Sequence, residues 1–311
     1  MTFTHDYDLD ALEPIQVHGQ RFCMQVTPRF RDRYENTEYE AYTARLLARM
    51  CARAAVFIDV GAHYGFFSLL VASRYPKLRV IAVEPSRVNF DVLERNIAAN
   101  GFAKVERLNV AISNRDGEAD LLISEASDNC SFYCHPSAGR RGTEQVRTTT
   151  IDGLLATAKS RPTVIKIDTD GHEFEVLDGM RRTIERNPDI ALFVEFNPKM
   201  IEVAGRKPAD LICRLDALGF AIFLLDDVRQ QHFRVSPETD WTTLFDPRSY
   251  ANLVCLPKAC AVSVLFFSHS VALGGAERSL LELVDEWMSD HWVLATIVCP
   301  HDGQLTTAMR S

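Results

Sequence analysis

The sequence predicts an α/β fold, with a doubly wound, mostly parallel sheet of seven strands. Three observations carry this prediction. Short apolar runs alternate with segments of helical periodicity from about residue 55 to 257. The first of these runs, Val56–Val60, breaks at glycines into a helical pattern. Charged residues directly follow several of the runs, at the positions where open parallel sheets bind their ligands.

Composition limits the class of protein. The chain has 311 residues, a net charge of −8 and 47% hydrophobic residues. The negative charge disfavours non-specific nucleic-acid binding, and no apolar run approaches the ~18 residues that a membrane span needs. The N-terminus, MTFTHDYDLD, is too acidic and polar for a secretory signal. The scattered cysteines are typical of free thiols in a reducing compartment. We therefore expect a cytoplasmic protein without a nucleic-acid partner or a transmembrane segment, and the oligomeric state stays open.

The elements are expected in the following order. An N-terminal extension, residues 1–54, contains a hairpin over 15–26 and a helix over 38–51 that packs on the core. The main domain, residues 55–258, has strands expected over 56–60, 79–83, 105–112, 118–124, 145–150, 163–168, 190–196, 221–225 and 251–256. Its helices are expected over 65–75, 86–100, 173–187 and 209–219, with a short one from residue 151. Segments 127–142 and 226–250 are expected to be irregular, and residues 259–311 form a separate partial unit.

The stretch VFIDVGAHYGFFSLL predicts the cofactor. A dinucleotide site needs G-x-G-x-x-G, but here His63 stands where the second glycine belongs, and its imidazole would crowd a pyrophosphate. S-adenosylmethionine has no phosphate: Asp59 suits its amine, the helix N-terminus suits its carboxylate, and Glu84 suits its ribose hydroxyls. A glycine turn without a ligand is the alternative. The predicted cofactor-binding set is Asp59, Gly61, Ala62, His63, Gly65, Glu84, Pro85 and Ser86.

A second polar cluster follows the strand TVIKID, in the run DTDGHE, and it predicts the catalytic end of the site. His172 is the first choice for a general base because its ordinary pKa lies near the working pH. Asp168 is the second choice and Glu173 the third, although a histidine or an acid here can also serve only as a helix cap. The residues expected to contact the acceptor are Asp170, Glu195, Asn197 and Ser131. A divalent metal held by Asp168, Asp170 and Glu195 is an alternative that the sequence leaves open.

These motifs together resemble a known family. The stretches FIDVGAHYGFFSLL, AVEPSRVNFDVLERN, NVAIS, TTTIDGLL, VIKIDTDGHEFEVLDGM, VEFNP and NLVCLP look like the FkbM family of class I S-adenosylmethionine-dependent methyltransferases. The resemblance runs from about residue 15 to 257. It implies a Rossmann-like fold and O-methylation of a hydroxyl on a sugar, a glycan or a polyketide-type product. His63 departs from the pattern, where a small or amide side chain is more usual.

The C-terminal segment carries a different resemblance. A strand over 262–267, the loop SHSVALGGAE, a helix and a strand over 292–299 form a partial βαβ unit. This unit looks like the start of a GT-B glycosyltransferase of the family 4 type, without its nucleotide-sugar donor half. Three functions are therefore open: a glycan methyltransferase, a fragment of a bifunctional methyl- and glycosyltransferase, and a binding module without catalysis.

Overall fold

The computed structural model describes residues 8–36, 38–136, 138–156, 163–246 and 248–259, and the backbone of 261–267, 278–279, 282 and 292–298. The chain divides into two units, Met1–Cys255 and Leu256–Ser311. Each unit is described by itself.

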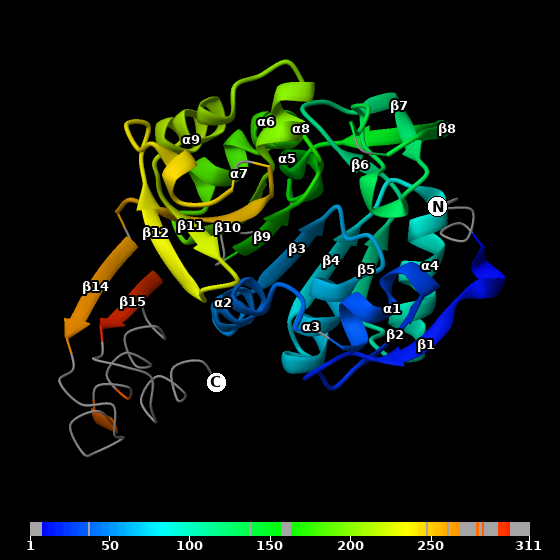
Figure 1. The fold of residues 1–311 in the computed structure, drawn as a ribbon, viewed down its shortest axis with the longest axis horizontal. Coiled ribbons are helices and arrows are strands. Elements are labelled where there is room, and N and C mark those ends of the chain that lie inside the picture. Colours follow the sequence, from blue (N-terminus) through cyan, green and yellow to red (C-terminus); the bar gives the residue numbers. More distant parts are fainter. Residues whose placement is uncertain are drawn as a thin grey trace. The chain divides into compact units, whose positions relative to one another are not determined.

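A large sheet forms the centre of the first unit (Figure 1). Within the described residues it has eight strands, in the order β12-β11-β13-β10-β9-β3-β4-β5. The strands from β10 to β5 run parallel, whereas β13 is antiparallel to β10 and β12 is antiparallel to β11. The bounds are β3 (Val56–Val60), β4 (Arg79–Val83), β5 (Val105–Leu108), β9 (Thr163–Ile167), β10 (Ile190–Phe196), β11 (Phe220–Asp226), β12 (Gln231–Val235) and β13 (Ala251–Pro257). The doubly wound, mostly parallel sheet is thus confirmed.

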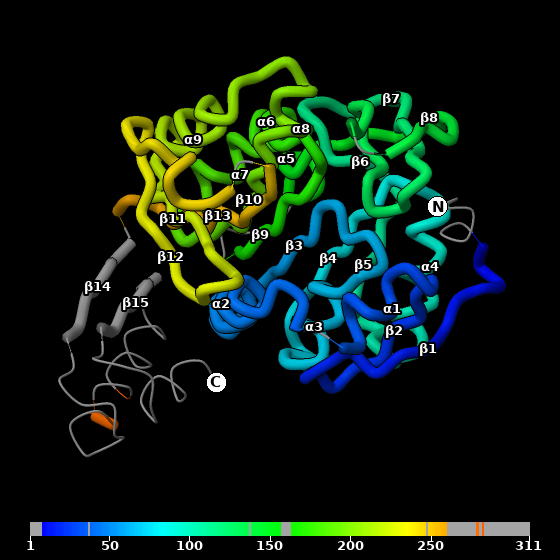
Figure 2. The backbone as a smooth tube through the Cα atoms, viewed as in Figure 1, coloured from blue at the N-terminus to red at the C-terminus, as the bar shows by residue number. Residues whose placement is uncertain are grey.

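Several details of the prediction were wrong. The sheet has an eighth strand because β12 forms inside the segment 226–250, which was expected to be irregular. The strand expected over 105–112 is two strands, β5 and β6 (Ala111–Ile112). Strand β6 instead joins β7 (Gly117–Ser124) and β8 (Arg140–Thr149) in a smaller sheet, which Figure 2 shows beside the large one. Strand β8 therefore includes the end of the loop expected over 127–142.

Helices flank the large sheet. They are α3 (Phe66–Arg74), α4 (Arg87–Ala99), α5 (Ile151–Leu154), α6 (Glu173–Asp178), α7 (Arg181–Arg186), α8 (Pro198–Val203) and α9 (Pro208–Ala217). The single helix expected over 173–187 is broken between α6 and α7. The break contains Gly179, where a Cβ would lie 2.0 Å from the carbonyl oxygen of Ser113. Close approach of another backbone segment therefore requires glycine here.

The N-terminal extension packs on this core. Strands β1 (Glu13–Gln16) and β2 (Cys23–Val26) form the expected hairpin, followed by α1 (Pro28–Glu35), which was not expected, and α2 (Ala41–Cys51). The carboxylate of Asp227, which lies 185 residues after Tyr42 in the sequence, caps α2. It accepts hydrogen bonds from the backbone N–H of Tyr42 (2.8 Å) and of Thr43 (2.9 Å), and from the Thr43 hydroxyl (2.7 Å).

In the second unit, β14 (Ala261–Phe267) and β15 (Trp292–Val298) pair in parallel. Both strands match the expected ranges, and a parallel pair requires a crossover connection between them. The glycine loop at 268–277 lies outside the described residues.

Among the residues that the structure describes, no helix is long and apolar enough to cross a membrane.

Candidate active site

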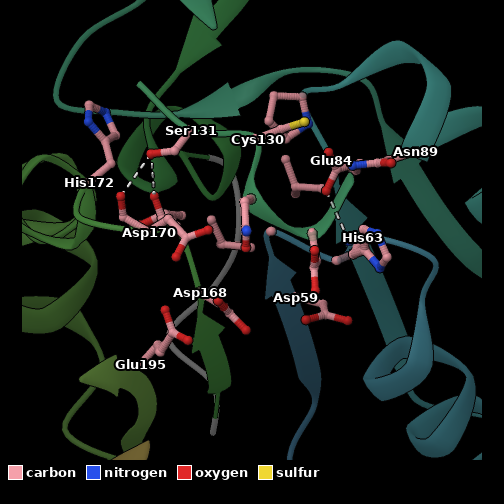
Figure 3. Close-up of a pocket in the computed structure, with 18 of the residues that line it drawn as sticks. Asp59, His63, Glu84, Asn89, Cys130, Ser131, Asp168, Asp170, His172 and Glu195 are labelled. Atoms are coloured by element: carbon pink, nitrogen blue, oxygen red, sulfur yellow. Dashed lines mark hydrogen bonds between the residues drawn. The ribbon is translucent and has the colours of Figure 1, made fainter. Parts of the chain in front are cut away.

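A cavity of about 310 Å³ opens at the carboxyl ends of the central parallel strands (Figure 3). Both clusters singled out from the sequence meet there. Of the predicted site residues, those lining the cavity are Asp59, Gly61, Ala62, His63, Glu84, Pro85, Ser131, Asp168, Asp170, His172, Glu195 and Asn197. Gly65, Ser86 and Glu173 do not belong to the described lining. Two stretches more than 100 residues apart in the sequence therefore share one pocket.

The two glycines of the first loop lie close to other parts of the protein, and Gly61 also lines the cavity. Gly61 has a φ of +79°, and a Cβ there would lie 1.8 Å from the carbonyl oxygen of Asp168. Gly65 has a φ of +94°, and its Cβ would lie 2.5 Å from Leu93 Cδ1. The sequence correctly marked a sharp turn, and the atoms nearest to a Cβ at these two positions belong to the protein.

Asp59 lies deep at the base of the cavity, 1% exposed. Its Oδ2 accepts a hydrogen bond of 2.7 Å from the hydroxyl of Ser68, in the first turn of α3. Burial raises the pKa of Asp59, and the nearby Lys166 opposes that shift. Asp59 therefore interacts with the N-terminal turn of α3, the same turn that was expected to receive a cofactor carboxylate.

Glu84 is held by backbone donors at the end of β4. Its carboxylate accepts from the N–H of His63 (2.9 Å) and of Ser86 (3.0 Å), which gives Ser86 a backbone role. Burial raises the pKa of Glu84 to about 7, although these two hydrogen bonds oppose the shift. The His63 imidazole stacks on Tyr64 with ring centroids 3.8 Å apart, and burial lowers its pKa to about 4. His63 thus contributes its backbone N–H to the site, with a neutral, packed side chain.

Asn89 is a candidate cofactor contact that the sequence reading missed. Its side chain lines the cavity and is 2% exposed, and its Nδ2 donates to the carbonyl of Ser127 at 2.9 Å. Its Oδ1 is buried and has no hydrogen-bond partner among the described residues. The available signal was a polar residue next to Phe90, within the buried stripe of a predicted helix.

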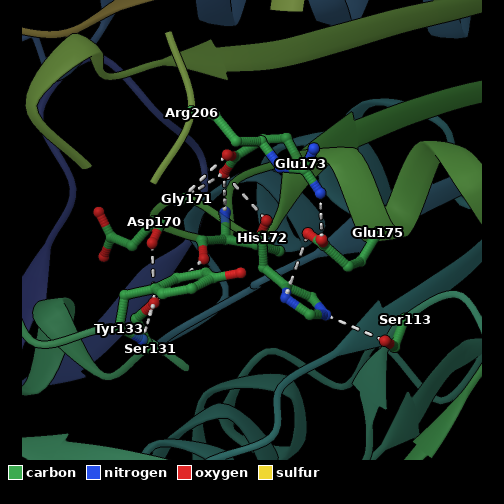
Figure 4. Close-up of polar contacts among 10 residues, drawn as sticks. Ser113, Ser131, Tyr133, Asp170, Gly171, His172, Glu173, Glu175 and Arg206 are labelled. Atoms are coloured by element: carbon green, nitrogen blue, oxygen red, sulfur yellow. Dashed lines mark hydrogen bonds and ion pairs between the residues drawn. The ribbon is translucent and has the colours of Figure 1, made fainter. Parts of the chain in front are cut away.

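The loop after β9 is held in a strained conformation (Figure 4). Asp170 has a φ of +48°, which is unfavourable for a residue with a side chain. The hydroxyl of Ser131 donates to the carbonyl of Asp170 at 2.8 Å, and the carboxylate of Glu173 accepts from the N–H of Thr169 and of Gly171, both at 3.1 Å. Burial raises the pKa of Glu173 to about 7. Ser131 and Glu173 therefore fix the backbone of this loop.

His172 faces other protein groups through both of its ring nitrogens. Nε2 lies 3.0 Å from the hydroxyl of Ser113, and Nδ1 lies 3.5 Å from Oε2 of Glu175, as Figure 4 shows. The ring packs 4.4 Å from that of Phe132. Burial lowers the pKa of His172, and Glu175 opposes the shift. These contacts favour a structural role over that of the base.

A line of polar side chains crosses the centre of the sheet. We call it the polar row: Asp59, Lys166, Asp168, Glu195 and Asn252. Asp59 pairs with Lys166 in the register of β3 and β9, and Glu195 pairs with Asn252 in that of β10 and β13. Lys166 is 2% exposed, and its Nζ lies 2.5 Å from Oδ2 of Asp168. The sequence reading missed Lys166, although a charge inside the apolar run TVIKID was the visible signal.

Two carboxyl groups of the cavity have a shifted pKa: Asp170, and Glu195 of the polar row. Burial raises the pKa of Asp170 and that of Glu195 well above the usual value, and the neighbouring Asp168 adds to both shifts. Oε2 of Glu195 is buried without a hydrogen-bond partner among the described residues. Within that same set, no group of three or more His, Cys, Asp or Glu side chains could hold a metal ion. The metal alternative thus gains no support from ligand geometry.

The lining of the cavity also includes residues that the sequence reading did not single out. Arg33, Tyr34 and Tyr39 come from the N-terminal extension, and Tyr250 precedes β13. The Arg33 guanidinium lies 5.0 Å from the ring centroid of Phe30 and 5.8 Å from that of Tyr39. This part of the cavity is therefore aromatic, with one cation stacked on its rings.

Comparison with known proteins defines the class. The family model described as "Methyltransferase FkbM domain" matches residues 59–230, more than half of the chain. The chain belongs to the FkbM methyltransferase family.

Curated relatives are more distant. Methyltransferase sdnD of Sordaria araneosa is 26% identical, over 40% of this chain and 59% of the relative. Hexuronic acid methyltransferase AglP of Haloferax volcanii is 28% identical, over 45% of this chain and 56% of the relative. The match thus spans less than two thirds of either relative.

Solved structures are similar only weakly. A precorrin-6y C5,15-methyltransferase from Geobacter metallireducens has 10% identity and a TM-score of 0.40, over 71% of this chain and 88% of that one. A Pyrococcus abyssi tRNA (uracil-54, C5)-methyltransferase in complex with S-adenosyl-L-homocysteine has 13% identity and a TM-score of 0.41, over 79% and 44%. Both TM-scores are below 0.5, so neither similarity bears on the function of this chain.

Proposed function

We propose that this protein transfers a methyl group from S-adenosylmethionine to a hydroxyl of a sugar or glycan. The observation that carries the proposal is the single cavity shared by Glu84 on one side and by Asp168, Asp170 and Glu195 on the other. The first side has the chemistry to hold a nucleoside. The second side has the chemistry to orient an alcohol beside it.

The residues present fit the proposed cofactor. The cavity, at about 310 Å³, reaches the lower end of the range for small-molecule sites. Glu84 offers a carboxylate to ribose hydroxyls, and the unpartnered Oδ1 of Asn89 is a buried acceptor in need of a donor. Asp59 offers a negative charge near the start of α3. When bound, S-adenosylmethionine supplies a methyl group already activated on a sulfonium.

Asp168 is the residue that we assign to the acceptor proton, in place of His172. It lines the cavity together with two other carboxyl groups, Asp170 and Glu195, whose pKa burial raises. Neutral carboxyls can donate hydrogen bonds to sugar oxygens, whereas an ionised one accepts the hydrogen bond of the reacting hydroxyl. The different surroundings of Asp168, Asp170 and Glu195 thus give three chemically similar acids different roles toward the acceptor.

A saccharide acceptor is supported by two observations. One relative is named as a hexuronic acid methyltransferase. The aromatic wall with Tyr39 and Tyr250, opposite hydrogen-bonding carboxyls, offers both a surface for the face of a sugar ring and partners for its hydroxyls. A polyketide-type acceptor is the competing candidate.

Transfer of tritium from S-adenosyl-[methyl-³H]methionine tests the proposal. The acceptors are methyl glucuronide, methyl glucoside and a hydroxylated macrolactone, each offered separately. We expect label on a glycoside that survives mild alkali, as an ether does and a methyl ester does not. The Asp168→Asn variant serves as the control and should transfer little. Label found only on the macrolactone would contradict the saccharide assignment, and no binding of S-adenosylhomocysteine in calorimetry would contradict the cofactor.

We also propose that the second unit is the start of a glycosyltransferase-like fold. The parallel pairing of β14 with β15 and the sequence SHSVALGGAERSL support this. Incubation with uridine diphosphate glucose and the same glycosides tests for glycosyl transfer, and we expect none from this chain.

A further inference from the structure

We propose that Lys166 is a positioning residue for methyl transfer: it holds the carboxylate of Asp168 in one orientation. This inference rests on the proposed function, in which Asp168 receives the acceptor proton. Lys166 itself touches neither the acceptor nor the cofactor in this role. It acts through Asp168.

The contacts of Lys166 are specific. The residue lies in the middle of β9, between Asp59 on β3 and Phe193 on β10 in the strand register. Its Nζ lies 2.5 Å from Oδ2 of Asp168 and 4.7 Å from the ring centroid of Phe67. The side chain of Lys166 is 2% exposed, whereas that of Asp168 is 29% exposed. The buried partner thus fixes one oxygen of a carboxylate that still reaches the cavity.

The surroundings keep Lys166 charged. Burial alone lowers the pKa of Lys166, but Asp168, Glu40 and Asp59 together raise it above its usual value. An ammonium group has three donors and no acceptor, so Lys166 in this state cannot itself take a proton from the acceptor. It can only orient and balance negative charge, and the closest negative atom described for it is Oδ2 of Asp168.

Glu40 shows that this charge balance is built from distant parts of the chain. It precedes α2 with a φ of +43°, and Oε2 of Glu40 accepts a hydrogen bond of 2.9 Å from Asn252 on β13. Burial raises the pKa of Glu40, and Lys166 opposes that shift. Glu40 therefore competes with Asp168 for the same ammonium group.

The kinetic test uses Lys166→Met and Lys166→Arg in the full chain, with methyl glucuronide as acceptor. In Lys166→Met we expect kcat at pH 7 to fall about 10²-fold, the scale for a misplaced catalytic group, with KM for S-adenosylmethionine within about threefold. Lys166→Arg should recover part of kcat, because it restores a cation beside Asp168. Arg79→Met, which breaks an exposed ion pair with Glu106, is the matched control.

The outcomes separate this inference from the proposed function. If Asp168→Asn transfers methyl groups normally, the assignment of Asp168 fails. If Asp168→Asn is inactive while Lys166→Met keeps its kcat, the role of Lys166 fails. A loss of kcat in Lys166→Met without any recovery in Lys166→Arg would also overturn it, since that result indicates a purely structural lysine.

A second measurement needs neither an acceptor nor a foldable methionine variant. In protein labelled with ¹⁵N-lysine, a buried ammonium in slow exchange should give a protected Nζ resonance that is absent from Lys166→Arg. In Asp168→Asn we expect this resonance to shift and to exchange at least tenfold faster. An unchanged resonance in Asp168→Asn would show that the ammonium is held by other groups, and the proposal would fall.

Discussion

Glu84 is a buried carboxylate at the position where we expect the ribose of the cofactor. Its carboxylate already accepts two backbone hydrogen bonds, and a pair of ribose hydroxyls would add donors to the same group. Replacement by glutamine keeps the volume and removes the charge. We expect Glu84→Gln to weaken S-adenosylhomocysteine binding by about 2–3 kcal/mol, the scale for hydrogen bonds to charged groups. Calorimetry on the folded variant measures this, and an unchanged affinity would remove Glu84 from the cofactor site.

The same residue predicts a pH dependence of stability without cofactor. The pKa of Glu84 is raised to about 7 from the usual 4.5, so proton binding stabilises the folded state. This contribution is complete below pH 4.5 and is lost as the pH rises through 7. Between pH 5 and 8 we expect the free energy of unfolding to fall by on the order of 3 kcal/mol through Glu84.

Urea titrations at several pH values check this prediction. The decline should be smaller by about that amount in Glu84→Gln, while the exposed control Glu106→Gln should follow the wild type. Glu173, whose pKa burial also raises to about 7, adds a similar decline that persists in Glu84→Gln. A parallel decline in Glu84→Gln and wild type would assign the whole effect to other groups.

At the scale of single residues, the sequence identified charged residues that follow strands, and it missed polar residues inside strands and helices. Glu84 and Asp168 stand after apolar runs, so the topology of a parallel sheet brings them to one edge. Lys166 and Asn89 sit within such runs, where periodicity predicts core. The position of the His172 ring nitrogens depends on Ser113 and Glu175, and only the packed structure defines those contacts.

Among the elements, the β3–α3 turn depends on Gly61. The Cβ of an alanine would overlap the carbonyl of Asp168, and the φ of +79° is itself unfavourable for alanine. We expect Gly61→Ala to cost several kcal/mol in urea unfolding, more than the 1–3 kcal/mol for strained backbone alone.

Gly101 offers a matched control for this prediction. It has a φ of +68°, but no described atom lies within 4 Å of its Cβ. Gly101→Ala should therefore cost only about 1–2 kcal/mol, the backbone term by itself. Equal costs at the two glycines would mean that the β9 backbone moves away from residue 61 easily.

A second prediction concerns α2 and its distant cap. Asp227→Ala removes the acceptor for two backbone N–H groups and for the Thr43 hydroxyl. We expect a loss of about 1–3 kcal/mol, the cost of leaving such donors unpaired. Asp246→Ala, at a carboxylate whose ion pair with Arg248 is exposed, should change the free energy of unfolding by less than about 0.5 kcal/mol. Similar values for the two variants in urea titrations would show that α2 does not depend on its cap.

Two of the elements that the sequence missed are short. The strand β12 has five residues and the helix α8 has six, so each shows its hydrophobic pattern over only a few positions. Their stability comes from neighbours: β12 pairs with β11, and the side chain of Asn197 caps α8. Long apolar strands such as β10, buried along its whole length, were clear from composition alone.

At the scale of the whole molecule, β13 is the last strand along the chain to join the large sheet. Its residues Leu253, Val254 and Cys255 are fully buried, and the strand pairs with β10. We expect a chain ending at Lys258 to bind S-adenosylhomocysteine within about threefold of the full chain, a difference below about 1 kcal/mol.

A chain ending at Tyr250, which lacks β13, is the control and should fail to fold. Circular dichroism and calorimetry on both shortened chains test this prediction. If the chain ending at Lys258 also fails to fold, the second unit is required by the first, and a boundary near 258 is wrong.

The polar row has a consequence for laboratory evolution. Burying Asp59, Lys166, Glu195 and Asn252 within a sheet is costly, and exchange of buried charged groups for apolar residues is often stabilising. A library of variants selected only for heat resistance should therefore accumulate aliphatic pairs at positions 59 and 166. Such survivors would be robust proteins without their chemistry, so a thermostability campaign on this scaffold needs a simultaneous selection for methyl transfer.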